Sequence, residues 1–280
     1  MLRGMPGALV TGAGGGIGLA IARRLAGRGY DVAVSDIDGE AAERAAAGIG
    51  ERAWPLQLDV TDGEACRAAA AQVAERAGSL DVWVNNAGVL MTGPSYEQDE
   101  ASRRTMLDVN AFGTFNGTLA AIELMRTQGP GNGSGKIINV VSLAGLVAAP
   151  GETAYSASKH AAMAFTIGTL ADLRRNGIKG IELSALCPDG VWTPMVQAKL
   201  DDPEAAVSWS GVMLTPERIA DAAESLLDHP RPVLAVPRWR GSFVRFFDHF
   251  PSLAVRAIPL VMKDARRRQR RFARKLERQK

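Results

Sequence analysis

The sequence reads Val10-Thr11-Gly12-Ala13-Gly14-Gly15-Gly16-Ile17-Gly18 between an apolar run, Ala8–Val10, and a segment of helical periodicity, Ile17–Gly27. Glycine suits such a strand-to-helix turn because the turn is tight and an anion must approach the backbone closely. The helix N-terminus then offers free N–H groups and a positive dipole end. The glycine spacing departs from the common G-x-G-x-x-G pattern. We predict a pyrophosphate-binding turn made by Gly12, Gly14, Gly16, Ile17 and Gly18, with a plain glycine-rich turn as the alternative.

The same alternation of strand and helix patterns continues through the first 190 residues. Short apolar runs typical of buried strands lie at Ala8–Val10, Asp31–Ser35, Pro55–Leu58, Asp81–Val84, Lys136–Val141 and Ile181–Leu186. Helical periodicity covers Ile17–Gly27, Asp38–Ile49, Asp62–Ala77 and Ser102–Arg126. Apolar strands separated by helices predict an α/β fold, a Rossmann-type doubly wound parallel sheet. We expect one such domain over residues 1–237 and a C-terminal helical extension over residues 238–280.

Composition limits the class of protein. The chain has 280 residues, of which 46% are hydrophobic and 22% charged, as is usual for globular proteins. Its two cysteines are too few for a disulfide framework, and its three histidines lie far apart, so we expect a cytoplasmic protein without a metal site. The N-terminus lacks the apolar run of a signal peptide, and no segment has the length of a membrane span.

Charge is distributed unevenly along the chain. Residues 263–280 hold ten Lys/Arg and two Asp/Glu, a net charge of +8, and the other residues hold 23 Lys/Arg and 28 Asp/Glu, a net charge of −5. A basic patch limited to the tail, without a recognition motif, excludes a general nucleic-acid-binding protein. The tail follows an aromatic segment with Phe243, Phe246, Phe247 and Phe250. Two interpretations of residues 243–280 remain open: peripheral contact with a membrane, or a helix packed on the protein or on a partner subunit.

Asp36 ends the second predicted strand, 24 positions after Gly12. A carboxylate there can accept hydrogen bonds from both ribose hydroxyls of adenosine, and it repels a 2′-phosphate. Neither position 15 nor position 37 holds a basic residue that could bind that phosphate. Asp36 therefore favours NAD over NADP. The alternative is a solvated Asp at the end of a strand.

Tyr155-Ser156-Ala157-Ser158-Lys159 begins another helical segment. Tyr155 and Lys159 are four positions apart and so share one helix face. A neighbouring ammonium favours the ionised form of a phenol, so we expect Lys159 to lower the pKa of Tyr155 and make it a general acid/base. The alternative is a surface lysine on an amphipathic helix.

Together, Thr11–Gly18, Asn85-Asn86-Ala87-Gly88, Asn110, Ser142 and Tyr155-x-x-x-Lys159 resemble the short-chain dehydrogenase/reductase family, with matching order and spacing over residues 6–195. The resemblance implies that Tyr155 exchanges a proton with the substrate oxygen while hydride moves at the nicotinamide. Lys159 would hold the nicotinamide ribose, and Ser142 would hydrogen-bond the substrate oxygen. Asn110 would hold a water molecule that leads to Lys159. Family members also form dimers or tetramers, so we expect a homo-oligomer.

The resemblance also extends the expected cofactor site. Asn86, Ala87 and Gly88 would line the dinucleotide, and Asp59 and Val60 would contact the adenine. Pro188, Val191 and Thr193 match the segment that holds the nicotinamide carboxamide. Within that segment, Asp189 stands where the family usually has glycine. Because Asp adopts a positive φ less readily than glycine, Asp189 puts the local backbone geometry in doubt.

The resemblance implies that the loops after the fourth, fifth and sixth strands contact the substrate, and here these loops are rich in large apolar residues. We expect the wall of a substrate pocket to include Leu90, Met91, Leu143, Val147, Trp192, Met195, Trp209 and Met213. The first two loops hold no Lys or Arg, which favours a hydrophobic small-molecule substrate. The sequence therefore predicts an NAD-dependent oxidoreductase that interconverts a sterol-, retinoid- or lipid-like secondary alcohol and its ketone. The alternative is a catalytically silent dinucleotide-binding protein with a membrane- or partner-binding tail.

Overall fold

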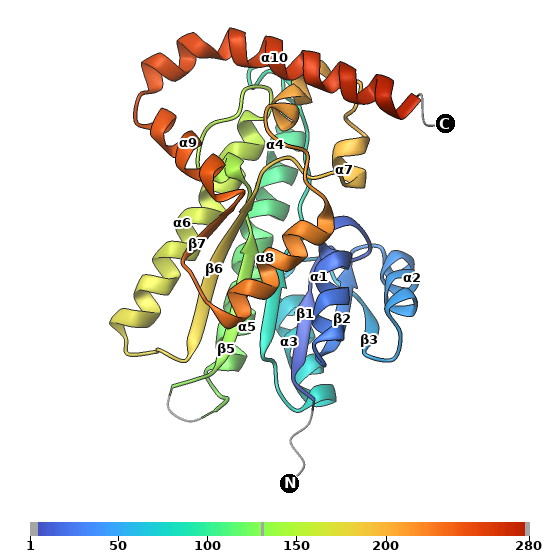
Figure 1. The fold of residues 1–280 in the computed structure, drawn as a ribbon. Helices are drawn as coiled ribbons and strands as arrows, with labels where there is room; N and C mark the ends of the chain where they lie inside the picture. Colours follow the sequence, from blue (N-terminus) through green and yellow to red (C-terminus); the bar gives the residue numbers. More distant parts are fainter. Residues whose placement is uncertain (1–4, 130–131, 278–280) are drawn as a thin grey trace.

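A computed structural model describes residues 5–129 and 132–277 (Figure 1). The centre of the molecule is a parallel sheet of seven strands in the order β3-β2-β1-β4-β5-β6-β7. The strands are β1 (Gly7–Val10), β2 (Asp31–Asp36), β3 (Ala53–Gln57), β4 (Val82–Asn85), β5 (Gly135–Val140), β6 (Ile181–Pro188) and β7 (Val233–Val236). The predicted doubly wound sheet is confirmed. β7 is an additional edge strand that the sequence analysis did not predict.

Helices cover both faces of the sheet, so the inner strands are apolar throughout. One face packs against α1 (Gly16–Gly27), α2 (Gly39–Ile49) and α8 (Pro216–Asp228). The other packs against α3 (Gly63–Ala77), α5 (Gly113–Met125) and α6 (Thr153–Arg175). Two large apolar clusters result, one on each side of the sheet.

The segment predicted as one helix, Ser102–Arg126, is interrupted. It consists of α4 (Glu100–Leu107), a π-helical turn (Asp108–Phe112) and α5. A π-helical turn inserts one extra residue per turn and is frequent at functional sites. Here the turn contains Asn110, which is fully buried. The hydrophobic periodicity alone does not reveal this interruption, because one inserted residue shifts the helical period by less than one turn.

The C-terminal residues form two helices, α9 (Arg238–Asp248) and α10 (Pro251–Glu277), on the side of the molecule where the strands end (Figure 1). α10 crosses the short helix η3 (Pro203–Trp209). Gln269 Nε2 donates hydrogen bonds to the carbonyl oxygens of Lys199 and Asp202, at 3.1 and 2.8 Å. The interpretation of this segment as a helix packed on the protein is confirmed for this part of α10. None of the described helices is long and apolar enough to cross a membrane.

Candidate active site

A cavity of about 890 Å³ opens where the parallel strands end. It extends across the point at which the strand order reverses, between β1 and β4. Ligands of open α/β sheets bind at such a point because the loops of neighbouring strands diverge there. Residues of the first glycine turn, of α6 and of the C-terminal helices all line this cavity.

The glycine turn lines one end of the cavity with Gly12, Gly16 and Ile17. Gly12 has a φ of +60°, and a Cβ there would lie 2.7 Å from Cα of Ala87. Only glycine fits this position. Gly15, which the sequence analysis did not select, also lines the cavity, and a Cβ at Gly15 would meet nothing within 4 Å.

Two of the predicted cofactor glycines, Gly14 and Gly18, do not line the cavity. A Cβ at Gly18 would lie 2.4 Å from the carbonyl oxygen of Gly12, so this glycine allows α1 to approach the turn. The backbone N–H of Gly14 donates a 3.0 Å hydrogen bond to Asp36 Oδ2. Both glycines therefore shape the turn, and neither lines the cavity.

Asp36, Asp59 and Val60 line the cavity next to the glycine turn, as predicted. The carboxylate of Asp36 is fixed by Gly14 and by the backbone N–H of Asp38, at 3.2 Å from Oδ1. Ile37, which the sequence analysis did not select, is exposed and also lines this part. A fixed carboxylate beside an apolar side chain fits a ribose with free hydroxyls better than a phosphorylated ribose.

Asn86, Ala87 and Gly88 follow β4 and line the middle of the cavity. The Asn86 side chain donates 2.9 Å hydrogen bonds to the carbonyl oxygens of Thr11 and Gly12 and so holds the glycine turn against β4. Pro188, Val191 and Thr193 line the cavity from the loop after β6. The residues that were predicted on separate segments therefore lie along one continuous surface that fits an extended dinucleotide.

Ser142, Tyr155 and Lys159 meet at the other end of the cavity. Lys159 Nζ lies 5.7 Å from the ring centre of Tyr155 and donates a 3.1 Å hydrogen bond to the carbonyl oxygen of Val140. Ser142 follows β5 with a φ of +155°, a conformation that non-glycine residues adopt rarely and mostly at functional sites. Ser142 Oγ accepts a 3.1 Å hydrogen bond from the backbone N–H of Ala144.

Asn110 does not line the cavity and lies directly behind it. Its side chain exchanges two hydrogen bonds with the backbone of Val89, at 2.8 and 2.9 Å, and donates a third to Ser158 Oγ at 3.0 Å. A Cβ at Gly88 would lie 3.0 Å from Asn110 Oδ1 and 3.5 Å from Lys159 Nζ. Asn110 therefore positions the loop after β4 beside Lys159.

The prediction that Lys159 lowers the pKa of Tyr155 is wrong for this structure. Burial and the nearby Glu152 carboxylate raise the pKa of Tyr155 well above its usual value, and Ser142 acts in the opposite direction. Burial also lowers the pKa of Lys159 to about 8. Without a bound dinucleotide, Tyr155 carries its proton at neutral pH and is in the form of a general acid.

Asp189 does not adopt the positive φ that would favour the glycine that the family usually has at this position. Among the described residues, Ser142 is the only non-glycine residue with a positive φ. The Asp189 carboxylate lies 3.3 Å from Nε of Arg240, and both side chains are almost completely buried. Arg240 also donates a 2.7 Å hydrogen bond to Ser210 Oγ. Because Arg240 belongs to α9, this ion pair joins the loop after β6 to the C-terminal helices.

Replacing Arg240 by Leu is expected to lower the free energy of unfolding by about 3 kcal/mol, because it leaves the Asp189 carboxylate buried without a cation. The double variant Asp189→Asn with Arg240→Leu is expected to recover most of that loss. Urea unfolding of the three proteins measures both values. Equal stability of wild type and the Arg240→Leu variant would show that the pair does not hold α9.

Four of the eight predicted substrate-wall residues, Leu90, Leu143, Val147 and Met195, line the cavity. Trp192, Trp209 and Met213 do not, since they pack with Val196 and Phe272 in a small separate apolar cluster. Met91 is also outside the lining. The ring centres of Trp192 and Phe272 are 4.7 Å apart, so these aromatic residues anchor α10.

The C-terminal helices supply the part of the wall that the sequence analysis did not predict. Their contribution is mainly apolar and includes Phe243, Val244, Phe247, Ala254, Ala257, Ile258, Leu260, Val261 and Met262. Local sequence patterns do not show that residues 243–262 line the cavity, because the residues against which they pack are distant in the sequence. Glu152, in the loop before α6, is a further lining residue that was not selected.

Comparison with known proteins agrees with this geometry. Residues 7–204 match the family model for short chain dehydrogenases. The chain is 34% identical to a 3-beta-hydroxysteroid dehydrogenase of Comamonas testosteroni over 76% of this chain and 85% of that protein. It is 35% identical to a cyclopentanol dehydrogenase of a Comamonas species over 84% and 91% of the two chains. The crystal structure of a short chain dehydrogenase/reductase from Burkholderia phymatum in complex with NAD superimposes with a TM-score of 0.77 at 27% identity, over 88% and 93% of the chains. The chain therefore belongs to the short-chain dehydrogenase/reductase family, whose members are oxidoreductases that use nicotinamide dinucleotides.

Proposed function

We propose that this protein is an NAD-dependent dehydrogenase that interconverts a large apolar secondary alcohol and its ketone. The observation that carries the proposal is the position of Ser142, Tyr155 and Lys159 in a cavity whose remaining wall is mainly apolar. The C-terminal helices enlarge that apolar wall. Hydroxysteroid and cyclopentanol dehydrogenases among the relatives support a secondary alcohol as substrate.

The chain's own residues handle the proton and the position of the substrate. The dinucleotide, which the glycine turn, Asp36 and the loop after β6 would hold, would supply the hydride acceptor. In reduction Tyr155 gives its proton to the ketone oxygen, and oxidation is the reverse, in which the phenolate form takes the hydroxyl proton. Each direction therefore moves one hydride and one proton. Ser142 would hold the same oxygen by a hydrogen bond, and Lys159, which lies beside the Tyr155 ring, would hold the nicotinamide ribose. A titratable donor and a second hydrogen bond at the oxygen stabilise the charge that develops there.

A size series of secondary alcohols tests the proposed substrate class. With NAD, kcat/KM is expected to rise as apolar rings are added, roughly tenfold for each 1.4 kcal/mol of burial gained, until the cavity is full. Formation of reduced nicotinamide is followed by its near-ultraviolet absorbance. A preference for small or carboxylated alcohols over apolar ones of the same length would overturn the substrate class.

We also propose that the protein acts in the cytoplasm as a homo-oligomer. Both cysteines are free thiols buried in the protein, which suits a reducing compartment. Phe112 and Leu119 are exposed large apolar residues on the π-helical turn and α5, next to the stacked rings of Phe115 and Phe165. This apolar face supports association with a second copy.

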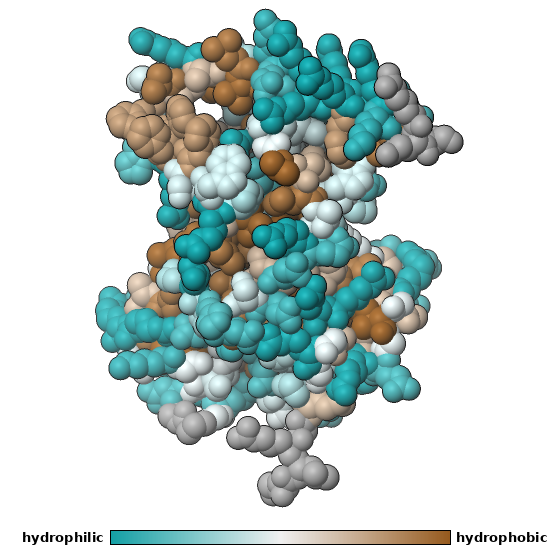
Figure 2. Space-filling model, in the orientation of Figure 1, coloured by the Kyte–Doolittle hydropathy of each residue, from teal (hydrophilic) through white to brown (hydrophobic). Residues whose placement is uncertain are grey.

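The C-terminal helices support a third proposal, peripheral contact with a membrane through residues 243–280. Half of the sixteen exposed large apolar residues of the described chain lie between residues 239 and 261. They are Trp239, Phe243, Phe246, Phe250, Leu253, Val255, Leu260 and Val261. In Figure 2, brown, hydrophobic side chains gather over α9 and the first half of α10, beside the teal, hydrophilic side chains of the second half of α10. An exposed apolar face next to basic residues is typical of helices that lie on anionic lipid.

Serine at Phe246, Leu253 and Val255 together is expected to weaken binding to vesicles of anionic phospholipid at least tenfold, because these side chains face away from the cavity. Sedimentation with vesicles measures the binding, and Tyr96→Ser, an exposed aromatic outside the C-terminal helices, is the matched control. Wild-type protein that stays in the supernatant at low salt would contradict the membrane contact. A dimer that the triple variant abolishes would instead assign this face to a second copy of the chain.

A further inference from the structure

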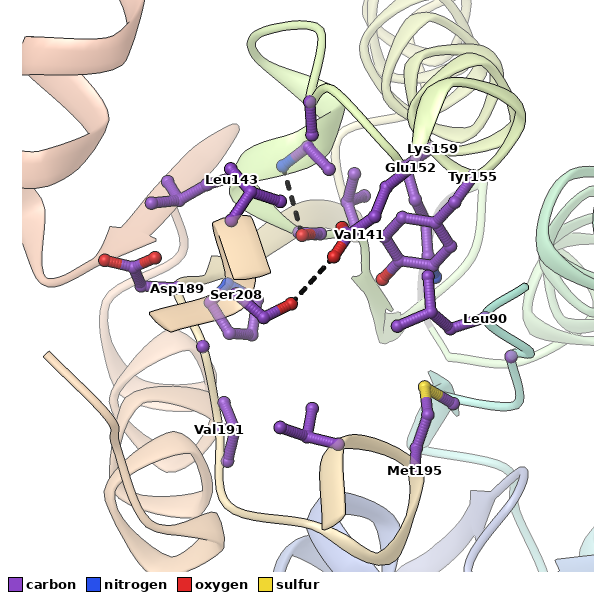
Figure 3. Close-up of a pocket in the computed structure, with 18 of the residues that line it drawn as sticks. Leu90, Val141, Leu143, Glu152, Tyr155, Lys159, Asp189, Val191, Met195 and Ser208 are labelled. Atoms are coloured by element: carbon purple, nitrogen blue, oxygen red, sulfur yellow. Dashed lines mark hydrogen bonds between the residues drawn. The ribbon is translucent and has the colours of Figure 1, made fainter. Parts of the chain in front are cut away.

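Glu152 is a buried carboxylic acid at the substrate end of the cavity. It is only 4% exposed and stands at the N-terminal boundary of α6, three residues before Tyr155. Figure 3 shows that its carboxyl group and the Tyr155 hydroxyl point to the same part of the cavity. The two groups are close enough for the Glu152 charge to raise the pKa of Tyr155. Glu152 therefore faces the place where the reacting carbon of a substrate would lie.

One oxygen of Glu152 is already occupied. Oε1 accepts a 2.9 Å hydrogen bond from the hydroxyl of Ser208 on η3. No described residue forms a hydrogen bond with the other oxygen, Oε2, which leaves it available to a ligand in the cavity. Glu152 is buried as a residue but lines the cavity, and sites that keep a buried carboxyl with one oxygen free commonly use it for binding.

No cation in the described structure neutralises Glu152. The two basic residues that line the same cavity are engaged elsewhere: Lys159 with the carbonyl oxygen of Val140, and Arg240 with Asp189. Asp202 is the other charge that acts on Glu152, and it is also negative. Burial and Asp202 raise the pKa of Glu152 to about 7, although the Ser208 hydrogen bond acts in the opposite direction. Below that pH the carboxyl is neutral and carries a proton.

The position of that proton follows from the contacts. Because Oε1 accepts from Ser208, the hydrogen of the neutral acid belongs on Oε2. Oε2 is then a donor directed at the cavity, and its natural partner is an oxygen that only accepts, such as a carbonyl. A pocket that bound only hydrocarbon would need no hydrogen-bond donor, and an apolar side chain could take the place of Glu152 there.

We propose that Glu152 is a specificity residue that binds a carbonyl oxygen next to the reacting carbinol, so that the substrate is an apolar hydroxyketone or diketone. This inference rests on the proposed function and narrows its substrate class. The hydrogen bond forms only while Glu152 is protonated. Substrate selection is therefore expected to weaken as the pH rises through the Glu152 pKa, because the ionised carboxylate repels a carbonyl oxygen.

The test compares two probes, cyclododecanol and its vicinal hydroxyketone, by the ratio of their kcat/KM values with NAD. Glu152→Met, which keeps the length of the side chain and removes the donor, is expected to lower the hydroxyketone preference about tenfold to 100-fold. Glu152→Gln keeps an N–H donor and does not titrate, so it should keep most of the preference and lose its pH dependence. Glu97→Met, the same substitution at an exposed glutamate outside the cavity lining, is the matched control and should leave the ratio unchanged.

A second measurement separates this inference from the proposed function. In the Tyr155→Phe background, binding of both probes to the complex with reduced nicotinamide is followed by its fluorescence, which needs no turnover. Adding Glu152→Met to this background is expected to lower the ratio of hydroxyketone affinity to alcohol affinity by the same factor as in the kinetic test. An equal effect of Glu152→Met on both probes, or a wild-type preference that is constant across pH, would overturn the role of Glu152. Failure of the wild type to oxidise either probe, with the binding preference intact, would count against the proposed reaction and leave the role of Glu152 supported.

Discussion

Tyr155→Phe is expected to lower kcat for alcohol oxidation by about 10²- to 10⁴-fold and to leave the affinity for NAD close to that of the wild type. The reason is the chemistry at one oxygen. Ser142 can hold the substrate oxygen, but a serine hydroxyl is a much weaker acid than a phenol and cannot replace it as the proton carrier. Removing the phenol oxygen removes the group that accepts the proton and preserves the ring that packs in the cavity wall. Steady-state kinetics and calorimetric titration with NAD measure the two quantities.

Tyr96→Phe is the matched control for this experiment. Tyr96 is 84% exposed and lies outside the cavity lining, so the same loss of one hydroxyl should change neither kcat nor NAD binding. If Tyr155→Phe kept wild-type turnover, another group would have to carry the proton, and the assignment of Tyr155 would be wrong. If it abolished NAD binding as well, Tyr155 would have a structural role.

Asp36→Asn is expected to lower the preference for NAD over NADP by about tenfold to 100-fold. Asn keeps an oxygen that can accept the Gly14 hydrogen bond, so the turn is preserved and the negative charge alone is lost. A charge-assisted hydrogen bond to a ribose hydroxyl contributes about 1.5–3 kcal/mol, and the same charge repels a 2′-phosphate. Calorimetric titration with both dinucleotides measures the change.

Asp38→Asn is the control for the cofactor experiment. Asp38 is a neighbouring exposed carboxylate that caps α2 through the backbone N–H of Ala41, and it does not line the cavity. Its replacement should leave the ratio of the two affinities unchanged. Wild-type protein that binds NADP as tightly as NAD would contradict the role of Asp36.

Sequence patterns were sufficient to predict six of the seven strands and the segments that line the glycine-turn end of the cavity, and the reason is local. The glycine turn, Asp36 and the loop after β4 each follow a strand, and parallel strands bring their carboxyl ends to one edge. The roles of Gly14 and Gly18 could not be separated in the same way. Whether a glycine faces the ligand or the backbone depends on distances such as the 2.4 Å between a Cβ at Gly18 and the Gly12 carbonyl oxygen.

The substrate end of the cavity is built from contacts between segments that are distant in the sequence. The sequence analysis therefore predicted only part of its lining residues. Trp209 is apolar and lies in the predicted loop, but it belongs to η3, against which α10 packs, and it shares one apolar cluster with Phe272. The same packing brings Phe243 and Ile258 to the cavity. The raised pKa of Tyr155 has a similar origin, since it depends on burial and on Glu152, which the spacing of Tyr155 and Lys159 does not reveal.

An apolar secondary alcohol is expected to give up a hydride to NAD in this cavity. The test follows ketone and reduced nicotinamide together, with NAD and the best alcohol of the size series. We expect one ketone for each reduced nicotinamide in the wild type, and neither product at a measurable rate with Tyr155→Phe. Binding of NAD without reduction by any apolar alcohol or hydroxyketone would contradict it and would favour a dinucleotide-binding protein without this activity.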